Sequence, residues 1–137
     1  MDTSAPQRRV LVVDDEKAIA DSLVLIFNQR GYQARAAYSA EEAVAMLDEW
    51  PPMLAVLDVI LPKMNGIDLA ILLKADVPYC EVVLISGQLA TSALAQRAAE
   101  NGRNFYIHAK PIHPLDLLSA AENLLSRPGL DPDLLRA

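Results

Sequence analysis

Carboxylates end two of the apolar segments in this sequence. Asp14 and Asp15 follow the run VLVV at residues 10–13, and Asp58 ends the run MLAVLD at residues 53–58. Adjacent carboxylates repel each other, and their ionised forms cost more free energy the nearer they lie to a buried strand. If the fold brings all three together, a cation has to compensate their charge.

A hydroxyl and an ammonium group end two further apolar segments. Ser86 closes EVVLIS at residues 81–86, and Lys110 follows NFYIHA at residues 104–109. Mg²⁺ prefers oxygen ligands, and a magnesium site held by one or two carboxylates usually serves a phosphate. The hydroxyl and the ammonium offer donors for the other phosphate oxygens. Asp58 is the candidate nucleophile, because a carboxylate can accept a phosphoryl group as an acyl phosphate.

Strands and helices alternate along the chain that carries these residues. Apolar residues recur with a helical period from Ile19 to Phe27, and Gly31 stands where a left-handed residue ends a helix. Ser39 and Glu42 form a capping box for a second helix, which the following prolines stop after Trp50. We expect strands at residues 10–13, 32–37, 53–58, 81–86 and 104–109, and later helices from residue 67, over residues 90–102 and from residue 114.

This alternation predicts an α/β fold. Strands that alternate strictly with helices form a mostly parallel sheet with helices on both faces, joined by right-handed crossovers. Five such units in this length fit a flavodoxin-like (βα)5 fold with a five-stranded parallel sheet in the order 2-1-3-4-5. Ligands of such sheets bind beyond the carboxyl ends of the strands. The fold therefore gathers one set of polar residues along one edge: Asp14, Asp15, Asp58, Ser86 and Lys110.

The composition narrows the classes of protein further. The 137 residues are 53% apolar and carry a net charge of −6, which suits one globular domain and argues against a general nucleic-acid binder. We expect no membrane span and no secretion signal, and the single cysteine, Cys80, fits a reducing cytoplasm. The expected division is an N-terminal extension at residues 1–8, one domain at 9–126 and a tail at 127–137.

Four short motifs in order carry a resemblance to a known family. They are VDDE at residues 13–16, LDVILPKMNG at 57–66, LIS at 84–86 and KP at 110–111. With these motifs the sequence resembles the receiver domain of two-component response regulators, roughly from Val10 to Ser126. The resemblance implies a phosphorylation-dependent signalling switch of the stand-alone, single-domain type. Its phosphoryl donor would be a sensor histidine kinase or a phosphotransfer protein, and its target an unknown protein, with no nucleic acid and no membrane as partner.

The resemblance also implies a role for each site residue. Asp58 would be the phosphoacceptor, Ser86 would bond the phosphoryl oxygen, and Lys110 would pair with it. The Lys110–Pro111 bond would be cis. The implied magnesium ligands are the side chains of Asp14, Asp15 and Asp58 and the backbone carbonyl of Ile60.

Two positions depart from the commonest pattern of that family. In many receivers an aromatic side chain three places before the lysine turns inward together with the serine or threonine. In this sequence the serine is Ser86, and the position three places before Lys110 is Ile107, which is not aromatic. The residue two places after the phosphoacceptor lies near the attacking water, and Ile60 cannot orient water. We therefore expect slow self-dephosphorylation.

Three other functions compete with this interpretation. An enzyme of the haloacid-dehalogenase type requires an acid at position 60, which is Ile60. A flavin or dinucleotide domain requires a glycine-containing phosphate loop after the first strand, and DDEKA at residues 14–18 has no glycine. A receiver-shaped interaction module that works without phosphorylation stays open as the alternative. In either form we expect a signalling protein that catalyses only its own phosphorylation and dephosphorylation, not a metabolic enzyme.

Overall fold

The computed structural model describes residues 8–87 and 106–126 of the chain, and its strands form one parallel sheet. The order β2-β1-β3-β4-β5 confirms the predicted order 2-1-3-4-5. Each strand is four to six residues long, and its β-branched and aliphatic residues favour a pleated, buried conformation. The strands are β1 (Arg9–Val13), β2 (Gln33–Ala37), β3 (Leu54–Asp58), β4 (Glu81–Ser86) and β5 (Tyr106–Ala109).

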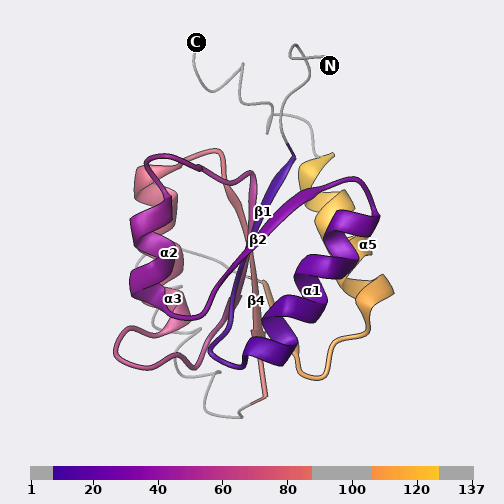
Figure 1. The fold of residues 1–137 in the computed structure, drawn as a ribbon, viewed down its shortest axis with the longest axis horizontal. Coiled ribbons are helices and arrows are strands. Elements are labelled where there is room, and N and C mark those ends of the chain that lie inside the picture. Colours follow the sequence, from indigo (N-terminus) through magenta and orange to yellow (C-terminus); the bar gives the residue numbers. More distant parts are fainter. Residues whose placement is uncertain (1–7, 88–105, 127–137) are drawn as a thin grey trace.

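Helices cover both faces of this sheet. Figure 1 shows α2 and α3 on one side of the strands, and α1 and α5 on the other. The bounds are α1 (Lys17–Gln29), α2 (Ala40–Met46), α3 (Gly66–Asp76) and α5 (Pro114–Leu125). The helix expected over residues 90–102 lies outside the described residues, as do the first two residues of the strand expected at 104–109.

The predicted helix ends are confirmed at two places and wrong at one. Gly31 has a φ of +89°, a left-handed value that follows the end of α1. Ser39 caps α2, because its Oγ accepts a hydrogen bond from the backbone N–H of Glu42 at 3.1 Å. The expected end of α2 at Trp50 is four residues too late. The regular helix stops at Met46, and residues 47–49 form turns. The N–H of Trp50 donates to the carbonyl of Met46 at 2.9 Å, and the Trp50 side chain is buried.

The two faces of the sheet have separate apolar cores. Leu11 and Val13 of β1 belong to the cluster under α2 and α3, whereas Val10 and Val12 belong to the cluster under α1 and α5. This alternation follows from the two-residue period of a strand. Because helices cover both faces, β1 and β3 have buried residues on both sides, and their apolar runs are continuous.

Strand register brings the predicted site residues to one edge of the sheet. Val13 is paired with Leu57, so the next residues, Asp14 and Asp58, leave their strands at the same level. Farther along the same edge, β4 and β5 end together at Ser86 and Ala109, just before the lysine at position 110. Among the residues that the structure describes, no helix is long and apolar enough to cross a membrane.

Candidate functional site

Buried polar side chains mark the carboxyl edge of the sheet. In the two described ranges the buried polar or charged residues are Asp14, Asp58 and Ser86, with 0%, 5% and 4% of their surfaces exposed. They follow or end the neighbouring strands β1, β3 and β4. Burying a charge or hydroxyl costs free energy unless the group is paired, so this concentration indicates a functional site.

Lys110 joins two of these carboxylates. Its Nζ donates to Oδ2 of Asp14 and to Oδ2 of Asp58, at 2.9 Å in both cases. The lysine side chain is 17% exposed, so both ion pairs are shielded from most of the solvent. The Lys110–Pro111 peptide bond is cis, as the resemblance implied. The backbone N–H of Lys110 also donates to the carbonyl of Ser86 at 2.9 Å.

Backbone amides hold the second oxygen of each buried carboxylate. The N–H of Glu16 donates to Oδ1 of Asp14 at 2.9 Å, and the N–H of Ile60 donates to Oδ1 of Asp58 at 3.0 Å. Each carboxylate therefore has one amide and one ammonium partner. Hydrogen bonds to an ionised group are stronger than those between neutral groups, and they fix the direction of both carboxylates.

The electrostatic balance of the site favours a lysine cation and disfavours an Asp58 anion. Burial raises the pKa of Asp58, and the hydrogen bonds from Lys110 and Ile60 reverse only part of that rise. Burial lowers the pKa of Lys110, but its hydrogen bonds to Asp58 and Asp14 outweigh burial and raise it. The ammonium therefore stays charged at neutral pH, and Asp58 is harder to ionise than an ordinary carboxyl group.

Three carboxylates converge closely enough to share a metal ion. Asp14, Asp15 and Asp58 each offer an oxygen, and these oxygens lie within 4.8 Å of one another. Asp15 is exposed, so the cluster opens to solvent on one side. One ammonium faces three acids, which leaves an excess of negative charge. Oxygen donors, excess negative charge and access to solvent fit the ligand preference of Mg²⁺.

The two remaining predicted residues lie in the loop after β3 and in β5. Ile60 is in the loop after β3, with 42% of its surface exposed, next to the phosphoacceptor candidate. Ile107 is in β5, is half-buried and packs against the core under α2 and α3. Strand register pairs it with Leu84 of β4, two residues before Ser86.

Gly66 supports the site in a way that its place in the LDVILPKMNG motif did not reveal. A Cβ atom built on Gly66 would lie 2.1 Å from the backbone oxygen of Asp58, which no side chain tolerates. Its N–H donates to the carbonyl of Val59 at 2.7 Å. The start of α3 therefore packs directly on the backbone of Asp58 and Val59. The sequence signal was a glycine at the end of the loop, but its contact depends on the folded path.

An apolar groove beside Lys110 also has no counterpart in the sequence expectations. It has a volume of about 570 Å³ and lies between α1 and the segment that joins β5 to α5. Mostly apolar residues line it, and the lysine stands at its edge next to the carboxylates. The lining residues are Ala18, Ile19, Ser22, Leu23, Ile26, Ile85, Lys110, Pro111, Ile112 and Pro114.

Comparisons with known proteins find relatives over most of this chain. The sequence profile of the family described as response regulator receiver domain matches residues 10–122. The DNA-binding response regulator MtrA of Mycobacterium bovis is 32% identical over 134 residues, which cover 96% of this chain and 56% of MtrA. A crystal structure of a CheY-like response regulator receiver domain protein from Methanospirillum hungatei is 28% identical, with a TM-score of 0.76, and the match covers 96% of this chain and 100% of that one.

A second relative helps to correct the expectation about nucleic acid. The alginate biosynthesis transcriptional regulatory protein AlgB of Pseudomonas aeruginosa is 34% identical over 123 residues, which cover 89% of this chain and 27% of AlgB. The chain thus spans about half of MtrA and about a quarter of AlgB. Excluding nucleic acid on the basis of an acidic charge is wrong, because relatives of this chain are named as DNA-binding and transcriptional regulators. The net charge of the receiver domain gives no information on what the other domains of a response regulator bind.

Proposed function

The chain belongs to the response regulator receiver domain family, and we propose that it is a signalling switch that accepts a phosphoryl group on Asp58. The observation that carries the proposal is the buried carboxylate of Asp58, with the ammonium of Lys110 at 2.9 Å and two further acids beside it. The proposed receiver spans residues 9–126, between flanking segments at 1–8 and 127–137. A cytoplasmic location accompanies this role.

The proposed reaction is an in-line displacement at phosphorus. A carboxylate oxygen of Asp58 attacks the phosphoryl group of a phosphohistidine, an oxygen–phosphorus bond forms, and the phosphorus–nitrogen bond to the imidazole breaks. The imidazole leaves with the electron pair of that bond and takes up a proton. Lys110 turns from the carboxylates to a phosphoryl oxygen, and the Ser86 hydroxyl donates to another. Water later hydrolyses the acyl phosphate, so the protein returns to its starting state without acting on any further substrate.

The proposed metal ligands are the carboxylates that converge at the site. Asp14, Asp15 and Asp58, with the backbone carbonyl of Ile60, would hold Mg²⁺, and the ion supplies positive charge to the phosphoryl oxygens when it is bound. Lys110 alone leaves the three acids undercompensated. A divalent cation and the lysine together match the charge that develops during transfer.

The groove beside Lys110 is the proposed docking surface for the phosphoryl donor. It is apolar, has a volume of about 570 Å³ and meets the candidate site at the lysine. A sensor histidine kinase or a phosphotransfer protein that packs on α1 here would bring its phosphohistidine to Asp58. The phosphoryl group would then shift an existing equilibrium through Ser86 and Ile107 and change the surface near β5, which a downstream protein reads.

Phosphoryl uptake from a small donor tests the function directly. We expect intact-mass spectrometry to show one added phosphoryl group when wild-type protein is incubated with acetyl phosphate and Mg²⁺, and none when EDTA replaces Mg²⁺. Asp58→Asn should take up none, whereas Asp76→Asn, at the exposed end of α3, should behave like wild type. Uptake by Asp58→Asn would overturn the assignment of the acceptor. No uptake by wild type would favour the interaction module that works without phosphorylation.

A further inference from the structure

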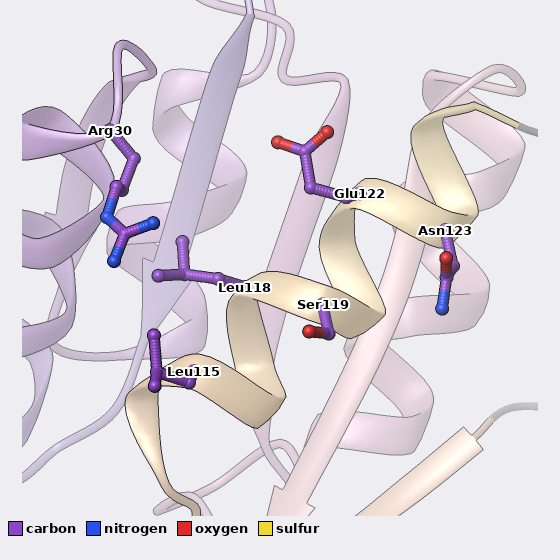
Figure 2. A pocket seen from close by; sticks show the side chains of 6 residues that line it. All are labelled: Arg30, Leu115, Leu118, Ser119, Glu122 and Asn123. Carbon is purple, nitrogen blue, oxygen red and sulfur yellow. The ribbon is translucent and has the colours of Figure 1, made fainter.

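A tyrosine flanks each end of β2. Tyr32 precedes the strand and Tyr38 follows it, and each hydroxyl donates a hydrogen bond to a carboxylate on a helix. The acceptor of Tyr32 is Glu122 of α5, which lines the pocket shown in Figure 2. The acceptor of Tyr38 is Asp21 of α1. Because β2 runs parallel to β1, only Tyr38 lies at the carboxyl edge of the sheet, where the candidate phosphorylation site is.

Strand register places Tyr38 beside the acid pair. The last residues of β1 and β2 are paired, so Asp14 and Tyr38 leave neighbouring strands at the same level. The backbone N–H of Asp14 donates to the carbonyl of Ala37 at 3.1 Å, directly before the tyrosine. Asp14 and Asp15 both belong to the loop between β1 and α1. Tyr38 therefore adjoins the segment that presents two of the three carboxylates of the proposed magnesium site.

Contacts to two helices fix Tyr38. Its hydroxyl donates to Oδ1 of Asp21 at 2.6 Å. The ammonium of Lys17, four residues before Asp21 on the same face of α1, lies 5.1 Å from the centre of the tyrosine ring. On the other side, the backbone N–H of Tyr38 donates to Oε1 of Glu42 in α2 at 3.2 Å. The tyrosine thus joins the end of β2 to the start of α1, where the loop that carries the acid pair ends.

Asp15 is the carboxylate whose position depends most on this loop. Lys110 and a backbone amide hold each of the carboxylates of Asp14 and Asp58. Within the described part of the chain, the exposed carboxylate of Asp15 has no such hydrogen bond or ion pair. The backbone of the loop therefore decides where the Asp15 oxygens lie. That backbone is tied to β2 at one end and to the first turns of α1, which Tyr38 contacts, at the other.

We propose that Tyr38 is a positioning residue of the magnesium site, and that its hydrogen bond to Asp21 holds the loop between β1 and α1 in the conformation that binds the ion. The inference rests on the proposed function, because it concerns the same site. Without this bond the start of α1 moves more freely relative to β2. The carboxylate of Asp15 then lies close to Asp14 and Asp58 for a smaller fraction of the time, and the affinity for Mg²⁺ falls in proportion.

A magnesium titration of the whole chain, followed by amide NMR, tests the proposal. The amide shifts of Asp15 and Glu16 give the Kd for Mg²⁺. We expect Tyr38→Phe to raise this Kd about two- to fivefold, because a single hydrogen bond contributes a modest free energy. Asp21→Ala should raise it by the same factor, and the double variant should show no further increase, since both substitutions remove one bond.

Two variants separate this bond from charge and from stability. Asp21→Asn removes the charge but retains an acceptor oxygen, so it should keep the Kd of wild type. Tyr32→Phe removes the tyrosine–carboxylate bond at the opposite end of β2. It should lower the midpoint of urea unfolding without changing the Kd.

Hydrogen exchange in EDTA gives a readout that needs no metal ion. The amide of Asp14, which donates to the carbonyl of Ala37, should exchange faster in Tyr38→Phe than in wild type, and at the wild-type rate in Tyr32→Phe.

Each result decides between the positioning role and its alternatives. The same Kd in wild type and Tyr38→Phe would overturn the positioning role and leave the magnesium site standing. An equal increase in Tyr32→Phe would also overturn it, because loss of stability would then explain both variants. An increase in Asp21→Asn as large as in Asp21→Ala would assign the effect to charge instead of the hydrogen bond. No binding of Mg²⁺ by wild type would contradict the proposed function itself.

Discussion

At the scale of single residues, the chemistry depends on how the charge of Asp58 is balanced. Lys110 pairs with Asp58 and Asp14 at the same distance, so its one positive charge is shared by two buried acids. Asp58 is therefore poised for a further cation, and its raised pKa reports that its ionised form is costly in the folded protein. The proposed function requires the ionised form of Asp58, whereas the same ionised form destabilises the folded domain.

Asp58→Asn should stabilise the protein at pH 7 in the absence of Mg²⁺. The pKa of Asp58 is higher in the folded state than its ordinary value of 3.8, so the folded protein retains a proton that the unfolded chain has lost. Stability therefore falls as pH rises from 3.8 through the folded pKa, and above that window the ionised Asp58 costs free energy. Urea unfolding in EDTA should give a higher midpoint for Asp58→Asn, with the difference shrinking below pH 3.8.

The matched control for this experiment is Asp76→Asn. Asp76 is exposed at the end of α3, and its substitution should leave the midpoint within about 0.5 kcal/mol of wild type in free energy. Equal or lower stability of Asp58→Asn than of wild type at pH 7 would contradict the charge balance described for the site.

Ile60→Asn should shorten the lifetime of the phosphorylated protein. Ile60 is 42% exposed beside Asp58 and has no polar group that could orient a water molecule for attack. An asparagine amide can hydrogen-bond such a water, so we expect the decay rate to increase several-fold. Loss of the added mass after removal of the donor measures the rate, and Ile60→Val, which adds no polar group, serves as control. An unchanged rate in Ile60→Asn would remove water orientation as the cause of a slow decay.

At the scale of elements, the loop between β3 and α3 must keep a close path around the site. Gly66→Ala should destabilise the protein by about 1–3 kcal/mol or more, because its Cβ would lie 2.1 Å from the backbone oxygen of Asp58. Gly87→Ala is the matched control, since its Cβ would meet Lys110 Cβ at an ordinary 3.7 Å. Urea unfolding compares the two variants, and equal stability would show that α3 does not need to pack so tightly.

Most of these elements could be predicted from the sequence, because their signals are local. Apolar runs mark β1, β3 and β4, a glycine with positive φ follows α1, and a serine caps α2. The end of α2 could not be predicted as well. Residues 47–50 have a helical composition, so the change from helix to turn after Met46 has no clear local signal.

At the scale of the whole molecule, the topology explains why the candidate site could be assembled from sequence. Acidic, hydroxyl and ammonium groups at the ends of different strands must meet at one edge once the order of strands is known. Strand order does not determine the individual contacts at that edge, because these depend on side-chain conformations and on the paths of the loops. The sharing of Lys110 between Asp14 and Asp58 has no signal in the sequence, and the glycine at position 66 does not by itself reveal its contact with Asp58.

The measurement that tests the central claim most directly is amide NMR of the wild-type protein with beryllofluoride, a mimic of the phosphoryl group, with and without Mg²⁺. If Asp58 takes a phosphoryl group beside a bound metal ion, beryllofluoride with Mg²⁺ should shift the amides of Ile60, Ser86 and Ile107, and Asp58→Asn should show none of these shifts. Mg²⁺ alone should shift only residues near the three carboxylates. An unchanged spectrum of wild type with both additions, or equal shifts in Asp58→Asn, would contradict the account.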